Sequence, residues 1–303
     1  MEPTRDNWRW PDLGEPELVE RLLLDEDEFH DLWVSMSRQM PARKYTDEVF
    51  DLSTGYPWAR PTGSFVLDDG EGRLLADLDR DERTMVLETF TGPGSDRTPM
   101  LAIGSNASPE GLWRKFAHFT EPPDRTLLAV TGRLEDFDVG ASAELALYGA
   151  MPATIFPSPG TLVDVTLIWL TSAQLTQLAW AEVPYWLGRL DARFEAEDLV
   201  AALGFAGTSE SLVFVNRFGT FAPDDRPIAL SAIGAEGRRV EAMAQVELLQ
   251  RLAQTVFGPE LTARELVRRT YERLDQIGPE VARVMRSNSI PFESDRWTPY
   301  PGP

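Results

Sequence analysis

The sequence predicts an α+β protein in which a β-rich middle segment is flanked by two mainly helical segments. Runs rich in Val, Ile, Leu, Thr and aromatic residues are concentrated between about residues 96 and 235. Residues 1–95 are acidic and place apolar side chains at helical spacing, and residues 236–303 return to that spacing. We therefore expect three regions: an acidic, mainly helical region over 1–95, a β-structure over 96–235 and a helical extension over 236–303.

The N-terminal region is expected to contain helices and a pair of short strands. Residues 16–40, PELVERLLLDEDEFHDLWVSMSRQM, predict one or two amphipathic helices that end at Pro41. Residues 64–78 predict a strand, an acidic turn and then a second strand or short helix. Residues 79–90 predict a helix, and the Gly- and Pro-rich residues 51–63 predict turns.

The middle region is expected to contain strands separated by turns and helices. The predicted strands cover residues 126–134, 144–156, 162–170 and 211–218. The sequence PSPG over 157–160 is predicted to be a turn between two of them. A helix is expected over 172–185, with Ser172 as its N-cap, and another over 194–203.

The C-terminal region is expected to form three helices, over residues 237–258, 261–278 and 279–288, the first ended by Gly258. Their apolar residues recur at helical spacing, so each helix has one face to bury. That face either packs against the rest of the chain or forms the surface of a homodimer.

Charge and hydropathy limit the partners. The chain has 49 acidic and 29 basic residues and a net charge of −20. Such a field repels nucleic acid and anionic lipid, so we expect neither as a partner. No apolar run reaches the roughly 20 residues that span a bilayer, and the start, MEPTRDNWRW, has no apolar signal core. We expect a cytoplasmic protein.

The chain has no cysteine and only two histidines, His30 and His118. Thiolate nucleophiles, disulfides and cysteine-ligated metals are excluded. A site with several histidines would need a second subunit, and we expect no metal.

The stretch MLAIGSNASPEGLWRKF, residues 100–116, carries the first candidate site. Gly104, Ser105 and Asn106 follow an apolar strand, and small residues there let successive N–H groups point to one side and bind an anionic group. Pro109 suits the first position of the following helix, which Ser108 or Asn106 would cap. The stretch is either an ordinary strand–turn–helix or a cradle for a ligand.

Glu182 is the second candidate. Helical spacing places it on one apolar stripe with Leu175, Leu178 and Ala179. A carboxylate there is costly if it is buried, and must then be paired, protonated or kept for a function. The alternative is that Glu182 lies at the solvated end of its helix.

Three stretches in order, AIGSN (102–106), YGAMPATIFPSPG (148–160) and LTQLAWAEVPY (175–185), are similar to the motifs of the γ-glutamylcyclotransferase-like family. That family runs YGSN, a segment like ATIxPSPG, a strand, and a helix ending LDxxEGxxY. The resemblance covers about residues 97–220. It implies a small closed mixed β-barrel with flanking helices, to which this chain adds N- and C-terminal helical regions.

The resemblance also implies a reaction: cleavage of a γ-glutamyl amide by its own α-amine, which releases 5-oxoproline and an amine without a cofactor or metal. The substrate would be a small γ-glutamyl amine or a related amide. Glu182 falls on the general acid/base, and Tyr185 near the tyrosine that follows it. The residues on the YGSN loop, which holds the γ-glutamyl group, are Ile103, Gly104, Ser105 and Asn106.

The chain departs from the family pattern at three positions. Ile103 stands where the family has Tyr, Ala179 where it has Asp, and Val183 where it has Gly. Two other functions therefore stay open: a non-catalytic binding or scaffold protein that retains the barrel, and a related amide hydrolase or acyl transferase.

Overall fold

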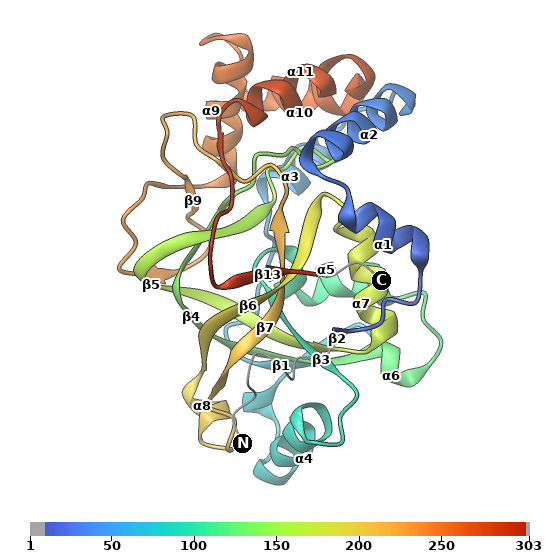
Figure 1. Ribbon diagram of the computed structural model, residues 1–303, viewed down its shortest axis with the longest axis vertical. Helices are drawn as coiled ribbons and strands as arrows, with labels where there is room; N and C mark the ends of the chain where they lie inside the picture. Colours follow the sequence, from blue (N-terminus) through green and yellow to red (C-terminus); the bar gives the residue numbers. More distant parts are fainter. Residues whose placement is uncertain (1–9, 301–303) are drawn as a thin grey trace.

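The computed structural model describes residues 10–300 and has a closed β-barrel at its centre (Figure 1). Its strands are β3 (Thr98–Ala102), β4 (Thr126–Ala141), β5 (Ala153–Leu170), β6 (Tyr185–Ala196) and β7 (Gly207–Asn216). Their order is β5–β3–β7–β6–β4, and β4 pairs again with β5 to close the barrel. Only β3 and β7 pair in parallel within it, so the barrel is mixed. The prediction of an α+β fold with a closed mixed barrel and terminal helices is confirmed.

The predicted turn over residues 157–160 is wrong, because these residues lie inside the continuous strand β5. Residues 158–161 form a bulge opposite Asp136, where the register between β4 and β5 shifts. Asp136 has a φ of 64°, and its Oδ1 accepts a hydrogen bond of 2.9 Å from the amide of Gly160. Since both flanks of PSPG pair with β4, the strand bends there and continues.

Two other strand predictions in the middle region need correction. The strand expected over 144–156 begins only at Ala153, and residues 142–152 form the connection between β4 and β5. The sequence does not predict β6, and its expected helix over 194–203 shrinks to α8 (Asp198–Ala201). β6 pairs with β7 on one edge, and with β4 and the C-terminal strand β13 (Trp297–Pro299) on the other. These distant partners, which no local pattern reveals, make it a strand.

The N-terminal region packs helices and a strand pair onto the barrel. The helices are α1 (Pro16–Leu23), α2 (Glu26–Gln39), α3 (Asp47–Thr54) and α4 (Arg80–Thr91). The predicted helical stretch 16–40 is two helices, because Asp25 starts the second with a capping box to Glu28. α3 is not predicted from the sequence. β1 (Phe65–Asp68) pairs with β2 (Glu71–Leu74) and with β4, so this region extends the barrel sheet.

The C-terminal helices are α9 (Gln245–Phe257), α10 (Ala263–Glu272) and α11 (Leu274–Arg286). The first begins eight residues later than predicted, because residues 237–244 are not helical and include the short strand β11 (Ala242–Met243). The helix begins where the carboxylate of Glu247 accepts a hydrogen bond from the amide of Ala244. The second ends at Glu272 with Arg273 as its C-cap, and α11 starts before Pro279 and contains it. Apolar residues of all three helices are buried within the chain.

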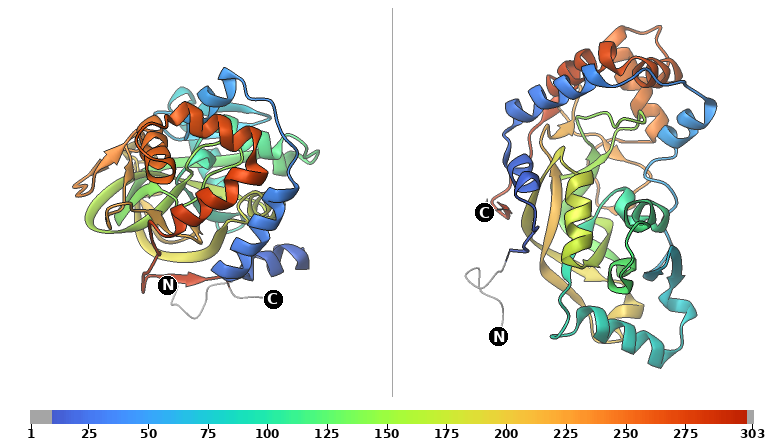
Figure 2. Two further views of the ribbon diagram at one scale, coloured as in Figure 1. Left: turned by 90° about the horizontal axis from the view of Figure 1, so that it is seen from above. Right: turned by 90° about the vertical axis from the view of Figure 1, so that its right-hand side faces the viewer.

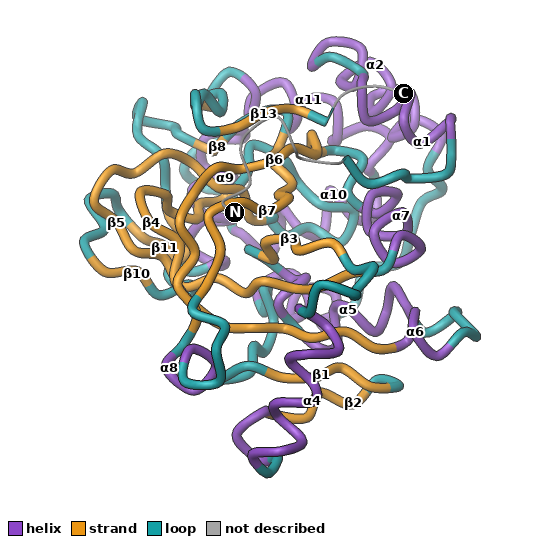
Figure 3. The backbone as a smooth tube through the Cα atoms, turned by 60° about the horizontal axis from the view of Figure 1, so that its bottom comes forward, coloured by secondary structure: helices purple, strands orange, loops and turns teal. Residues whose placement is uncertain are grey.

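These helices gather with α2 at one end of the barrel, the top of Figure 1, and both views of Figure 2 show α2 beside α11. At the opposite end lie α4 and α8, at the bottom of Figure 1 and in the lower part of Figure 3. Among residues 10–300, no helix has the length and apolarity that crossing a bilayer requires.

The remaining elements are short, except α7. They are η2 (Leu75–Asp77), η3 (Ser105–Ala107), α5 (Pro109–Phe116), α6 (Pro122–Arg125), α7 (Ser172–Ala181), β8 (Thr220–Phe221), β9 (Ala229–Leu230), β10 (Ala235–Glu236), β11 (Ala242–Met243) and β12 (Ser289–Ile290). The helices α5 and α7 pack on the outside of the barrel through Leu112, Phe116, Leu175 and Leu178, all fully buried. Burying each of these side chains stabilises the folded protein by about 1.5–3 kcal/mol, so both helices have fixed positions on the barrel.

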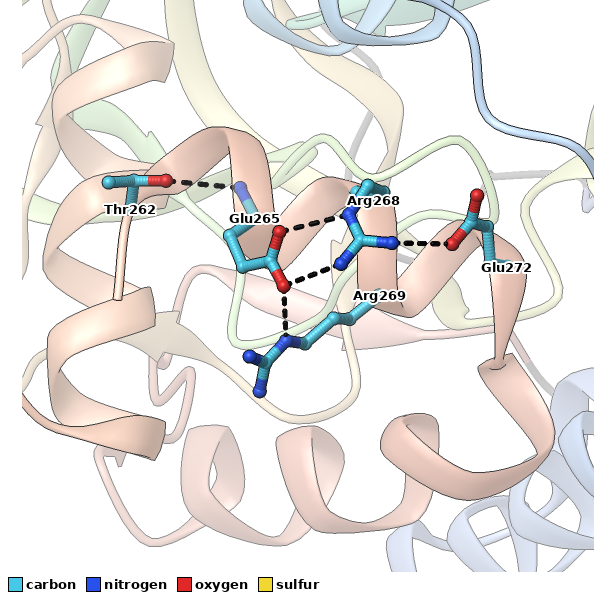
Figure 4. A network of polar contacts seen from close by, with 5 residues as sticks. All are labelled: Thr262, Glu265, Arg268, Arg269 and Glu272. Atoms are coloured by element: carbon cyan, nitrogen blue, oxygen red, sulfur yellow. Dashed lines mark hydrogen bonds and ion pairs between the residues drawn. The ribbon is translucent and has the colours of Figure 1, made fainter. Parts of the chain in front are cut away.

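The exposed face of α10 carries an ion-pair network (Figure 4). Thr262 caps the helix by accepting a hydrogen bond from the amide of Glu265. The carboxylate of Glu265 accepts hydrogen bonds from Arg268 and Arg269, which lower its pKa to about 2. Arg268 also donates to Glu272 at 3.0 Å. The network stabilises the helix surface and lies outside the cavity described next.

Candidate active site

A cavity of about 510 Å³ lies among α2, α5, the end of α7 and the β4–β5 connection. Every site residue that the sequence singles out lines it: Ile103, Gly104, Ser105, Asn106, Glu182 and Tyr185. The fold therefore brings together a loop after β3 and a residue after α7, which are more than 70 positions apart in the sequence.

Glu182 lies directly after the last residue of α7. Its amide donates to the carbonyl of Leu178 at 2.9 Å, so the position is fixed by the final turn of the helix. The N-cap of this helix is Thr171, which forms a capping box with Gln174. The prediction of Ser172 as the N-cap is wrong by one residue, because Ser172 is the first helical residue. Although Glu182 is at a helix end, its side chain is only 17% exposed and faces the cavity.

The carboxylate of Glu182 belongs to a triangle of polar side chains. Its Oε1 accepts hydrogen bonds from Lys115 Nζ at 2.9 Å and from Asn106 Nδ2 at 3.1 Å. Lys115 also donates to Asn106 Oδ1 at 2.6 Å. Lys115 is itself only 19% exposed along its side chain. The triangle places one cation and one anion side by side in a mostly covered site, where their interaction is stronger than at an open surface.

The loop over 103–106 is held from behind by two side chains that the sequence does not single out. Arg60 Nη2 donates to the carbonyl of Ile103 at 3.1 Å. The hydroxyl of Tyr56 lies against Gly104 and accepts a hydrogen bond from the amide of Ala153. Asn106 does not cap α5; Ser108 precedes that helix without a side-chain bond, and Pro109 is its first residue, as predicted. The Asn106 side chain is thereby left to bind Glu182.

Two buried tyrosines fix the first residue of β5. Tyr56 Oη accepts a hydrogen bond of 2.9 Å from the amide of Ala153, and Tyr185 Oη donates to the carbonyl of Ala153 at 3.1 Å. Burial raises the pKa of both phenols, and the charge of Glu182 acts in the same direction. Both tyrosines are therefore neutral at physiological pH, and they shape the cavity wall next to the glutamate.

Gly104→Ala should destabilise the protein by about 1–3 kcal/mol, the usual cost of overpacking a buried site. A Cβ at this position would lie 2.2 Å from Tyr56 Oη, a buried hydroxyl already bonded to Ala153. Chemical denaturation of the two proteins measures the change. Gly94→Ala is the matched control, because a Cβ there meets no atom within 4 Å. Equal losses in both variants would contradict the close contact.

A second carboxyl group lines the cavity. Glu144, in the β4–β5 connection, is 8% exposed, and its Oε2 accepts a hydrogen bond of 2.7 Å from Asn216 Nδ2. Burial raises its pKa to about 7, and the charge of Glu182 adds to that effect while Asn216 and Arg217 oppose it. The sequence places Glu144 at the start of a predicted strand and gives no sign of its position.

Sequence reasoning also misses Lys115 and Tyr56. Lys115 is one of only two lysines in the chain and follows Asn106 by nine residues, within the helix that the motif opens. That rarity is the signal that could have identified it. Tyr56 belongs to a stretch predicted only as turns, and nothing local indicates that its side chain reaches the loop over 103–106.

Comparison of the chain with models of known protein families finds no match, and comparison with curated protein sequences finds none either. The closed five-stranded mixed β-barrel is the part of the expected likeness that the structure shows. Within residues 10–300, no cluster of three or more His, Asp or Glu side chains has the arrangement of a metal site.

Proposed function

We propose that the protein is a γ-glutamylcyclotransferase-like enzyme, which converts a γ-glutamyl amide into 5-oxoproline and a free amine. The observation that carries this proposal is the ion pair of Lys115 and Glu182, 2.9 Å apart, on the wall of the cavity. The head of a γ-glutamyl compound is a zwitterion with one α-carboxylate and one α-ammonium group. A paired cation and anion in a covered site match that head charge for charge.

In this proposal the α-carboxylate of the substrate binds Lys115, and the α-ammonium binds Glu182. Asn106 bonds to both side chains and keeps them at a fixed separation. The γ-carbonyl then folds back toward the α-nitrogen, near the loop over 103–106. Holding the two reacting groups together supplies about 7–11 kcal/mol in favourable cases.

The chemical step needs one group that moves a proton twice. Glu182 accepts a proton from the α-ammonium, and the resulting amine attacks the γ-carbonyl carbon. A new C–N bond closes the five-membered lactam while the original amide C–N bond breaks. Glu182 returns the proton to the leaving nitrogen. The attacking nitrogen loses a second proton as it becomes the lactam N–H, and the released amine takes up that proton and leaves as an ammonium ion, so no water is consumed and the carboxylate is regenerated. The substrate provides its own nucleophile, which agrees with the lack of cysteine in the chain.

Ile103 stands where the family has a tyrosine, and in this chain a tyrosine from another element, Tyr56, lies against the same loop. Tyr56, just after α3, places its hydroxyl against Gly104 and bonds to Ala153. Ile103 is buried and packs in the core while its carbonyl accepts from Arg60. The loop is thus supported without the family tyrosine, which favours an intact binding loop.

Product analysis tests the proposal. The protein is incubated with γ-L-glutamyl-pentylamide, and the products are measured by mass spectrometry in water enriched in ¹⁸O. We expect 5-oxoproline without ¹⁸O together with pentylamine. Glutamate containing ¹⁸O would instead identify a hydrolase. Binding of the amide without either product would contradict turnover and favour a binding protein.

A further inference from the structure

The cavity is larger than a γ-glutamyl head needs, and most of its wall is apolar. The polar end carries Asn106, Lys115 and Glu182. The rest of the wall is formed largely by aromatic and apolar side chains, including Phe29, Leu32, Trp33, Met36, Trp58 and Tyr148. A volume of about 510 Å³ is in the range of sites that enclose whole small molecules, so there is room for a sizeable leaving group beyond the head.

Glu144 is the one carboxyl in the described lining besides Glu182. It also lines a small adjoining cavity with His30 and Phe218, so it lies at the junction of the two spaces. Its Oε2 accepts from Asn216, and within residues 10–300 it forms no ion pair with Lys or Arg. A carboxylate buried without a cation is costly, and a cationic ligand bound beside it would lower that cost.

The nearby guanidinium of Arg217 is directed elsewhere. Its N–H groups donate to four backbone carbonyls, those of Arg21, Leu22, Leu24 and Val183. It lowers the pKa of Glu144 through its charge, but its hydrogen bonds serve to fix the chain between α1 and α2. The hydrogen bond from Asn216 uses only Oε2 of Glu144, so Oε1 is available to a ligand in the cavity that Glu144 lines.

We propose that Glu144 binds a second, protonated nitrogen on the amine portion of the ligand, so that the cavity selects amines whose apolar carbon skeleton carries a further ammonium group. The inference rests on the proposed function for the position of the γ-glutamyl head at Lys115 and Glu182. The apolar wall accommodates the carbon skeleton, and its aromatic rings favour a nearby cation. The net charge of −20 draws cationic ligands toward the protein.

Amine binding measured by isothermal titration calorimetry at 150 mM salt tests this inference. The probes are 1,5-diaminopentane and 5-amino-1-pentanol, which have the same length and differ in one ammonium group. We expect the diamine to bind about tenfold more tightly or better, as a charge-assisted hydrogen bond in a covered site allows. Glu144→Gln should abolish this preference. Glu260→Gln, which removes one charge from an exposed position outside the cavity, should retain it.

Equal affinity for the two probes in the unaltered protein would overturn the inference, whether or not the Glu144 variant folds. A preference that persists in Glu144→Gln would also overturn it, because the second ammonium would then bind another group. Binding of free amines needs no turnover. A protein that prefers the diamine but makes no 5-oxoproline therefore contradicts the proposed function alone, and a protein that makes 5-oxoproline without this preference contradicts the inference alone.

Discussion

Glu182→Gln should lower kcat for 5-oxoproline formation by about 10²–10⁴-fold, the usual contribution of a positioned general acid/base. The amide of Gln can still accept a hydrogen bond from Lys115 and Asn106, so the triangle of side chains is retained. It cannot take a proton from the α-ammonium. KM should change much less than kcat, because Lys115 still binds the α-carboxylate. Steady-state kinetics with a γ-glutamyl amide, followed by product quantification, gives both constants.

Glu121→Gln is the matched control for this measurement. Glu121 is exposed, lies outside the cavity and precedes α6. Its variant should have the kcat of the unaltered protein, and circular dichroism should show the same fold for all three proteins. A Glu182→Gln variant with full turnover would show that another group transfers the proton, and the assignment of Glu182 would be wrong.

Glu144→Gln should make the protein more stable above pH 7, by up to about 3 kcal/mol, without changing its stability near pH 4. The ordinary pKa of 4.5 applies to the unfolded chain, and burial raises the pKa to about 7 in the folded protein. Each tenfold difference in proton affinity corresponds to about 1.4 kcal/mol, which gives the stated magnitude. The Gln side chain is uncharged at every pH, like the protonated form of Glu144.

The sign follows from which state binds the proton. Between pH 4.5 and 7 the folded protein holds a proton on Glu144 that the unfolded chain has lost, so folding stability falls as the pH rises. Above pH 7 Glu144 is ionised in both the folded and the unfolded state, and the stability lost by burying its charge no longer changes with pH. The groups that act on Glu144 are Asn216 and Arg217, which favour its charged form, and Glu182, which opposes it. His30 also faces the adjoining cavity.

Urea denaturation of both proteins from pH 4 to pH 8 measures the difference in unfolding free energy at each pH. For Glu144→Gln, the gain in unfolding free energy over the unaltered protein should rise from near zero at pH 4 to its maximum at pH 8. Glu260→Gln, an exposed change of the same charge, should give a difference that stays nearly flat. A flat difference for Glu144→Gln would show that this carboxyl ionises in the folded protein as it does in the unfolded chain.

Local patterns were sufficient where the deciding interactions are local. The predicted helices over 16–40 form as α1 and α2, and Asp25 and Asp79 cap their helices through partners three residues away. The strand at 162–170 and the start of α5 at Pro109 also follow from nearby residues. Patterns failed where the partner is distant: PSPG bends β5 because both its flanks pair with β4, and β6 is a strand because three other strands pair with it.

The candidate site divides in the same way. The small residues 104–106 and the carboxyl of Glu182 are visible in the sequence, because a nest needs small residues and a charge on an apolar helix face is conspicuous. Lys115, Tyr56 and Glu144 were not, since their significance depends on which side chains the barrel brings to one cavity. Whether the carboxylate of Glu182 is solvated or paired also depends on the tertiary structure.

From the residues alone we could predict the class of fold, the order of the helical and β-rich regions, and two segments of a possible site. These depend on residue spacing and on side-chain size, which short stretches of chain already contain. The tertiary structure alone decided that Glu182 meets Lys115, and that a second carboxyl, Glu144, is buried beside the same cavity. The physical reason is that burial and charge pairing are properties of the space between segments, and only barrel closure creates that space.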